Sequence, residues 1–442
     1  MKISQLLLFG IFFSGISIAS AQDKKSLTLD EAINMAWLNS NEVSLANTKV
    51  NTKKYELQAV KNERYPNVKV SGQYQHLTKA TIDLKLNNSS TSAEQSPVVN
   101  QLLLGQINAT LPVFSGFKIQ NSIIALDNLY QAENANAMQT KEAVAMQVVN
   151  YYARLYKAQK TVELLQENQK STKQRAVDFT ALEKNGIIPR NDLLKAQLQV
   201  SKLQLSLDSA TSELKNINYE LVSLLKLDPA TNLFIKESDF ANFQMNNIPT
   251  SETTALESRK DLEAIRLQEK ASLANVKVAK SGYYPQVAII SGYTSLGLKN
   301  VVTVQNAINI GVGFSYDLSG ILKNGTNVKI AQSKAVEVQN SENLLTDYIK
   351  IQFQKATEDY DLAIKQDLVY DEAVDQASEN YRIIKEKYDN GLSDTNDLLE
   401  ADVEQLGSKI NKALAKANVI QKYYELLSIS GQLNQTFNLS KI

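Results

Sequence analysis

The 442-residue chain contains no cysteine and only one histidine, His76. The lack of cysteine excludes disulfides, thiolate metal sites and a lipidated N-terminal cysteine. Lys and Arg together number 47, as do Asp and Glu, so the net charge is zero and we expect no nucleic-acid-binding surface. No Ser-His-Asp arrangement, phosphate loop or metal-spaced cluster is present. We therefore predict no enzymatic activity, no cofactor and no metal.

Glycine and proline are also scarce, with 16 and 7 residues in the whole chain. They are absent from 117–185 and from 326–390, which predicts two long helices, the first roughly 100 Å in length. Apolar residues in the first run repeat at spacings of three, four and seven, as in a coiled coil. They are Val144, Val148, Tyr151, Tyr152, Leu155, Val162 and Leu165.

Long hydrophobic runs are missing except at the N-terminus. There the run Leu6 to Ile18 is followed by Ala19-Ser20-Ala21, which predicts a secretory signal peptide over 1–21. No later stretch approaches the roughly 18 apolar residues that a membrane-spanning helix needs. If the protein crosses a bilayer, we expect it to do so with strands.

The sequence contains an internal repeat. Asn191-Asp192-Leu193-Leu194-Lys195-Ala196 recurs 205 residues later as Asn396-Asp397-Leu398-Leu399-Glu400-Ala401, and Gly186 matches Gly391 at the same offset. We expect a first structural repeat over 22–230, a linker over 231–249 and a second repeat over 250–442. Extra residues of the first copy are placed in the polar stretch 87–95. Each copy is predicted to contain a helix, a β-hairpin at about 66–116 or 285–319, the long helix 117–185 or 326–390, and a final helix at 190–228 or 392–430.

The hairpins show a period of two. Apolar residues occupy every second position in three stretches: Val68, Val70 and Tyr74; Ile107, Ala109, Leu111 and Val113; and Ile308, Ile310, Val312, Phe314, Tyr316 and Leu318. Between Tyr283 and Leu318 the only charged residues are Lys299 and Asp317, which favours a lipid-exposed face. Soluble hairpins that cap a helical bundle are the alternative. Four strands cannot close a barrel, so strands in lipid would require several chains to share one sheet.

Together these features resemble the TolC family of bacterial outer-membrane efflux channels. They comprise the signal peptide, Tyr-Pro before a strand, the hairpin, the Gly-free helix and the Gly followed by Asn-Asp-Leu-Leu, all but the first duplicated. The resemblance implies a long α-helical coiled-coil barrel and a transmembrane β-barrel of 12 strands shared in a homotrimer. It also implies a location in the outer membrane, contact with outer-membrane lipid and extension into the periplasm. The implied partners are a periplasmic adaptor, or membrane fusion protein, and an inner-membrane transporter.

The resemblance also assigns roles to single residues. Gly186 and Gly391 correspond to turns at the periplasmic tips, and their neighbours Ile187 and Leu392 belong to the surface that receives the adaptor. Asp397 and Glu400 match acidic residues that narrow the closed entrance. A second set matches a latch at the closed tip: Tyr388 and Asp192 form the family pair. Ser393 replaces the family arginine, for which Arg190 is the candidate substitute.

The predicted function is therefore passive export of substrates that an inner-membrane pump delivers. A periplasmic coiled-coil structural or adaptor protein is the alternative from a different class. Within the channel class, type I protein secretion stays open beside small-molecule efflux, since the pump selects the cargo.

Overall fold

A computed structural model describes residues 24–81, 98–241, 243, 245, 248, 249, 251–299 and 301–437. The predicted signal peptide and the polar stretch 87–95 lie outside these residues. The long helices expected from the Gly-free runs are present as α3 (Lys118–Lys184) and α8 (Leu318–Asp389), and each is followed by a shorter helix, α4 (Arg190–Leu224) or α9 (Thr395–Ile429). The helix α8 begins before the predicted Thr326, because the Asp317 carboxylate accepts the backbone N–H of Gly320 at 2.8 Å and caps the first turn.

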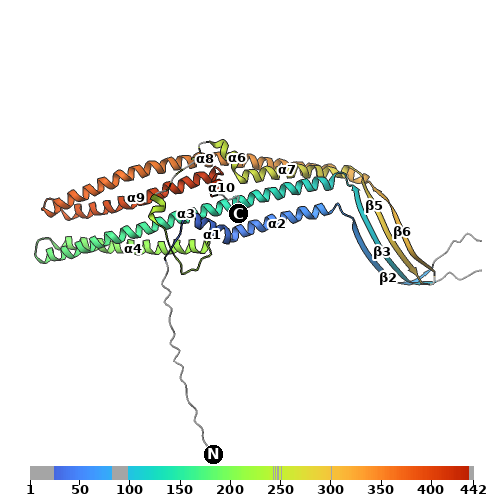
Figure 1. Ribbon diagram of the computed structural model, residues 1–442, viewed down its shortest axis with the longest axis horizontal. Helices are drawn as coiled ribbons and strands as arrows, with labels where there is room; N and C mark the ends of the chain where they lie inside the picture. The colour runs from blue at the N-terminus through green and yellow to red at the C-terminus, as the bar shows by residue number, and fades with distance from the viewer. Residues whose placement is uncertain are drawn as a thin grey trace, which may run out of the picture. The chain divides into compact units, whose positions relative to one another are not determined.

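The remaining elements precede the hairpins or join the two halves of the chain (Figure 1). Two helices precede the first hairpin and two precede the second: α1 (Leu29–Asn39), α2 (Asn41–Asn62), α6 (Glu252–Ser258) and α7 (Lys260–Lys280), the last followed by one 3₁₀ turn. The predicted linker carries structure of its own, namely β4 (Asn232–Phe234) and α5 (Glu237–Ala241). The strand β4 pairs in parallel with β1 (Lys24–Ser26), and α10 (Leu433–Thr436) lies near the C-terminus.

Four strands form one antiparallel sheet in the order β2, β3, β5, β6. Their bounds are Asn67–Thr81, Val98–Phe114, Gln286–Leu298 and Val302–Ser315. The register places Val70 opposite Ile107, and Gly292 opposite both Asn108 and Asn309. The two hairpins therefore join through β3 and β5, which leaves β2 and β6 as the edges.

The chain divides into two compact units, and each contains segments from both halves of the sequence. Within the described residues, unit 1 comprises the segments up to Ser40, 144–247 and 359–424. Unit 2 comprises 41–143, 248–358 and 425–437, and it contains the sheet.

In unit 1 the helix ends of the two copies share a core. Phe179 of α3, Leu193 and Ala196 of α4, and Leu398 of α9 are buried in one cluster. Tyr381, Ile384 and Tyr388 of α8 pack against the same cluster. Replacing a buried Phe by Ala typically costs about 3–5 kcal/mol, so this cluster contributes strongly to holding the four helix ends together.

Candidate functional site

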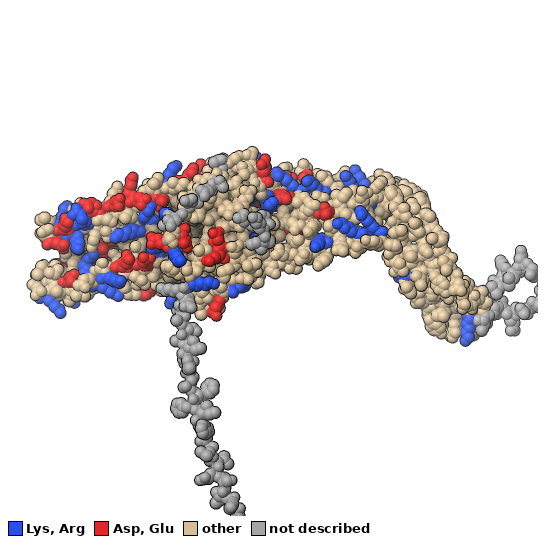
Figure 2. All heavy atoms as spheres, viewed as in Figure 1, with Lys and Arg blue, Asp and Glu red and all other residues tan. Residues whose placement is uncertain are grey.

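The four-stranded sheet presents apolar side chains on an unpartnered surface. Alternate residues of β6, namely Ile308, Ile310, Val312 and Phe314, are between 69% and 81% exposed. The strands β3, β5 and β6 contain no charged residue, and Figure 2 shows the face of the sheet almost free of Lys, Arg, Asp and Glu. Large apolar side chains in contact with water are costly at roughly 25 cal/mol per Å². The predicted period of two is thus observed up to Phe314, and it leaves an apolar surface to be covered. The predicted strand is too long at its end, because Leu318 already belongs to α8.

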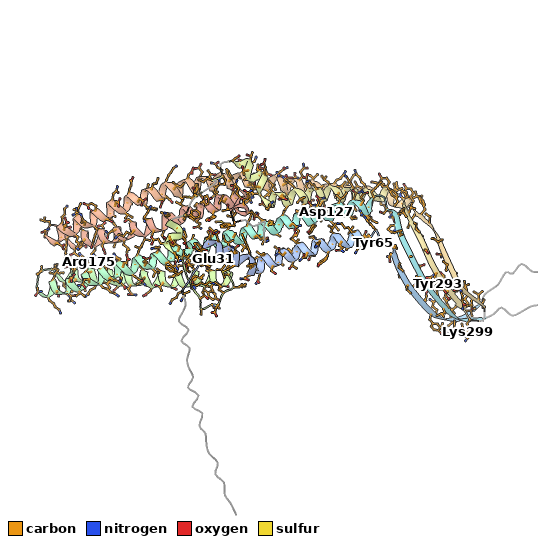
Figure 3. All side chains as sticks on the ribbon, viewed as in Figure 1. Glu31, Tyr65, Asp127, Arg175, Tyr293 and Lys299 are labelled. Carbon is orange, nitrogen blue, oxygen red and sulfur yellow. The ribbon has the colours of Figure 1, made fainter. Side chains whose placement is uncertain are left out.

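The junction between the helices and the sheet of unit 2 carries exposed aromatic rings. Tyr65 follows α2 immediately before β2 (Figure 3), and Tyr284 precedes β5. The Phe117 ring packs edge-on against Phe114 and Tyr284, with centroids 5.2 and 5.9 Å apart. Such amphipathic and aromatic rings are enriched where a protein passes from water into a membrane.

Gly186 and Gly391 occupy equivalent turns at the ends of α3 and α8. Their φ angles are +73° and +72°, the left-handed conformation that glycine adopts most easily. The Gly186 N–H donates to the Glu183 carbonyl at 2.9 Å, and the N–H of Ile187 donates to the Leu182 carbonyl at 2.9 Å. This is the Schellman pattern, and it satisfies carbonyls that the helix end would otherwise leave unpaired.

The second turn repeats this pattern bond for bond. The Gly391 N–H donates to the Tyr388 carbonyl at 2.9 Å, and the Leu392 N–H donates to the Lys387 carbonyl at 2.8 Å. The residue after each glycine is a large apolar one that stays in water: Ile187 is 67% exposed and Leu392 is 78% exposed. The two turns thus present matched apolar side chains on rigid backbones.

Asp397 and Glu400 lie exposed in the first turns of α9. The Asp394 carboxylate caps this helix by accepting the N–H groups of Asn396 and Asp397 at 2.7 and 3.0 Å. The Ser393 hydroxyl donates to Asp397 Oδ2 at 2.8 Å. Ser393, which stands where the resemblance expects arginine, therefore orients one of the two entrance candidates.

Glu400 lines a surface groove between α9 and α4. Lys195 and Lys202 of α4 line the same groove. Two positively charged side chains therefore lie in the same groove as the Glu400 carboxylate. The sequence pattern did not reveal this.

The predicted latch residues lie at the same helix ends, but they contact other partners. Asp192 accepts a hydrogen bond from the Thr395 hydroxyl at 3.0 Å, which joins α4 to α9. Arg190 Nη1 lies 3.4 Å from Glu183 Oε1, and Asp192 pairs with Lys195 at 3.4 Å. The Tyr388 ring stacks on Phe179 at a centroid distance of 5.8 Å, and its buried hydroxyl has no hydrogen-bond partner among the described residues.

A buried polar cluster that sequence reasoning missed joins three helices of unit 1. Nη2 of Arg175 on α3 (Figure 3) donates to the Tyr381 hydroxyl at 3.0 Å and to Asp402 Oδ1 at 3.2 Å. Asn168 also donates to Asp402 Oδ1, at 3.5 Å. Tyr381 belongs to α8 and Asp402 to α9. No local spacing in the sequence indicates that these residues meet.

The described part of the chain contains neither a metal-binding cluster nor a membrane-spanning helix. Within it, no group of three or more His, Cys, Asp or Glu side chains is arranged to hold a metal ion. Among its helices, none combines the length and the apolar character needed to cross a membrane.

The comparisons with known proteins agree with this architecture. Residues 253–432 match the family model described as outer membrane efflux protein. No curated protein matches the chain.

Solved channel structures share the fold at low sequence identity. VceC from Vibrio cholerae aligns with 15% identity and a TM-score of 0.76, covering 91% of this chain and 96% of its own. CmeC from Campylobacter jejuni aligns with 17% identity and a TM-score of 0.70, covering 93% and 88%. MtrE from Neisseria gonorrhoeae aligns with 14% identity and a TM-score of 0.74, covering 92% and 89%. These similarities establish the fold over nearly the whole chain.

The match to the outer membrane efflux protein family model lies within the second predicted repeat, and the solved channel structures share the fold of nearly the whole chain. Both findings agree with the outer-membrane efflux channel that the resemblance to the TolC family predicted. A match to an efflux family also agrees with the prediction of no enzymatic activity.

Proposed function

We propose that this protein is the outer-membrane component of a tripartite exporter and acts as a homotrimer. Three chains would together form a transmembrane β-barrel of 12 strands and a long α-helical coiled-coil barrel. The channel would conduct substrates passively. The energy would come from an inner-membrane transporter linked through a periplasmic adaptor.

The observation that carries this proposal is the pair of open sheet edges. The order β2, β3, β5, β6 leaves one side of β2 and one side of β6 without a neighbouring strand among the described residues. Unpaired backbone N–H and C=O groups each cost several kcal/mol in lipid, so an open edge is not tolerated there. Pairing β6 of one chain with β2 of the next satisfies both edges. The exposed apolar residues of β6 would then face lipid.

The number of chains in the oligomer, three, follows from the resemblance. The widths of closed barrels are consistent with it. A barrel of about eight strands is filled by side chains, whereas wider barrels leave a channel. Two chains would supply too few strands for a conducting pore, and three would supply enough. The exposed aromatic residues Tyr65, Phe117 and Tyr284 would mark the membrane boundary on the helical side.

The helix turns at Gly186 and Gly391 are the proposed docking points for the adaptor. Each presents an exposed apolar residue, Ile187 or Leu392, on a turn held by two backbone hydrogen bonds. A rigid turn with an apolar residue loses little conformational freedom on binding.

Asp397 and Glu400 are the proposed constriction at the entrance, with Asp192, Tyr388 and Arg190 as its latch. We further propose that 1–21 is removed as a signal peptide and that the mature chain is a duplicated unit, 22–230 and 250–442, joined by the linker.

The cargo is set by the transporter, and both small-molecule efflux and type I protein secretion fit this channel. Genes adjacent to that of the channel would identify the pump and adaptor.

Engineered cysteines test the shared barrel directly. The chain has no cysteine, so any disulfide must come from the introduced pair. Gln73→Cys in β2 would be combined in turn with Asn309→Cys, Gly311→Cys or Gly313→Cys in β6, which samples possible registers. At least one pair should give a ladder of covalent species that ends at three chains. A single cysteine, Gln73→Cys alone, serves as the control and should give no ladder. A monodisperse monomer in mild detergent, measured by light scattering, would rule out the proposal.

A further inference from the structure

Unit 1 contains a cavity of about 230 Å³ whose floor is apolar and aromatic. It lies where α1, α3, α5 and α9 meet, and buried side chains from three of these helices form its floor. They are Val149, Tyr152, Ala153, Phe240, Ile420 and Tyr424. Most ligand pockets share this combination of an apolar floor and a few polar groups.

The aromatic walls of the cavity are fixed by their own packing. Phe240 of α5 stacks on Tyr156 with ring centroids 4.0 Å apart, and on Tyr152 at 5.8 Å. Phe243 packs against Tyr424 at 5.5 Å. The Tyr152 hydroxyl lies 3.0 Å from the Leu27 carbonyl, which anchors the ring to the segment before α1. The rings are therefore held in place before any ligand arrives.

Two carboxylates stand at the polar side of this cavity. Asp30 of α1 and Asp239 of α5 both line it, and Asp239 Oδ2 lies 3.2 Å from the Tyr152 hydroxyl. Burial raises the pKa of Tyr152, and the charges of Asp239 and Asp30 raise it further. Burial likewise raises the pKa of Tyr424, with Asp30 the next contributor.

Among the described residues that line the cavity, none is basic. The Lys157 ammonium lies behind the lining residue Gln421, to whose Oε1 it donates at 3.0 Å. Within the part of the chain that the structure describes, neither Asp30 nor Asp239 forms an ion pair. An anion would meet two carboxylates without an ion-pair partner, whereas a cation would meet both carboxylates and the negative faces of several aromatic rings.

We propose that this cavity is a binding site for a small organic cation with an apolar or aromatic body. The positive group would lie between Asp30 and Asp239, and the apolar body would contact Phe240 and Tyr424. Cations over aromatic rings gain most where water is excluded, which the buried floor provides. The site belongs to a single chain, so it requires neither the trimer nor a pump partner, and its test is independent of the export function.

Isothermal titration calorimetry of the full-length protein in detergent tests this site, with empty micelles as the blank. Benzyltrimethylammonium is the probe, because it combines a quaternary ammonium with one aromatic ring. Benzylsulfonate is the matched compound of opposite charge. We expect saturable binding of the cation with a Kd below about 1 mM and no saturable binding of the anion.

Variants separate the carboxylates from the rings. Asp30→Asn with Asp239→Asn keeps the side-chain shapes and should weaken binding at least about tenfold. Phe240→Leu keeps an apolar side chain but removes the ring face, and it should weaken binding several-fold. Asp375→Asn, a substitution of an exposed carboxylate on α8, is the control and should bind like the unaltered protein. Circular dichroism would verify that each variant is folded.

Three results would overturn the proposal. They are an absence of saturable binding by the unaltered protein, equal binding by the doubly substituted protein, and equal affinity for benzylsulfonate.

Discussion

Arg175 of α3 and Asp402 of α9 form a buried ion pair, with Nη1 of Arg175 3.1 Å from Oδ2 of Asp402. Only 11% and 4% of the two side chains are exposed. The Tyr381 hydroxyl of α8 accepts a hydrogen bond from the same guanidinium, so three helices converge on one charge. Removing charges from water is costly, and the hydrogen bonds of Nη2 to Tyr381 and Asp402 offset part of that cost. Nη1 faces Asp402 but forms no hydrogen bond with the described residues.

Removing one partner of this pair should destabilise unit 1. Asp402→Asn leaves the guanidinium of Arg175 buried beside a neutral amide, which should cost about 3–5 kcal/mol. Thermal unfolding followed by circular dichroism, with hydrogen exchange of α9, measures the effect. The paired change Arg175→Met with Asp402→Leu should recover most of the loss. Glu386→Gln is the matched control, because the exposed pair of Glu386 with Arg382 is worth at most about 1 kcal/mol. Equal melting of the Asn variant and the unaltered protein would contradict the role of the pair.

Substitution of the turn glycines Gly186 and Gly391 should destabilise the turns because of backbone conformation alone. A Cβ added at Gly186 or Gly391 would meet no atom within 4 Å, so steric contact with other residues is not the cause. Val at either position must adopt a left-handed φ, which costs about 1–2 kcal/mol. Asn tolerates this φ and should cost less. We expect each Val variant to lower adaptor capture in crosslinking while the oligomer stays assembled.

Gly407 provides the comparison within α9. It has no neighbour within 4 Å of an added Cβ and lies inside the helix, so Gly407→Ala should stabilise the protein by about 0.5–1 kcal/mol. Unchanged adaptor crosslinking in both Val variants would show that the turns are not the docking points.

Glu142 of α3 should make the stability of unit 2 depend on pH. Burial raises the pKa of this carboxyl from 4.5 to about 7; Asp261 adds to the rise, and Lys260 and Arg259 oppose it. The folded chain therefore holds the proton more tightly than the unfolded chain does. The contribution of Glu142 to the free energy of unfolding is therefore greatest below about pH 4.5, and it falls as the pH rises towards 7. The loss is on the order of 3 kcal/mol.

The variant Glu142→Gln should remove this dependence, since its amide has no charge to bury. Melting temperatures measured at intervals from pH 5 to 8 would compare the two proteins. Asn434, whose side-chain amide donates to Glu142, is kept in both. A parallel fall of stability in the two proteins would mean that another group is responsible.

The entrance carboxylates should control ion selectivity. If Asp397 and Glu400 of three chains converge on one axis, they attract cations and bind multivalent ones. The double change Asp397→Asn with Glu400→Gln should relieve block by a trivalent cation and reduce cation selectivity in planar bilayers. Lys195 and Lys202 share the groove with Glu400, so Asp397→Asn alone should have the larger single effect. Equal selectivity and equal block in the double variant would place the constriction elsewhere.

The sequence by itself determined the kinds of element and much of their extent. The absence of Gly and Pro from 117–185 predicts one helix, and α3 spans Lys118–Lys184. The alternation at Ile308, Ile310 and Val312 predicts a strand with one apolar face, which β6 has. Helix and strand propensity depend on neighbours within a few residues, so a local pattern is sufficient for them.

Tertiary structure alone decided which distant residues meet. Arg175 and Asp402 are separated by 227 positions, and their contact depends on how α3, α8 and α9 pack in unit 1. The burial of Glu142, which raises its pKa, depends on the packing of α3 in unit 2. The cavity next to Asp239 exists because the predicted linker forms the helix α5, whose Phe240 stacks on two tyrosines of α3. Burial and pairing of polar groups are set by contacts between elements, which no periodicity within one element records.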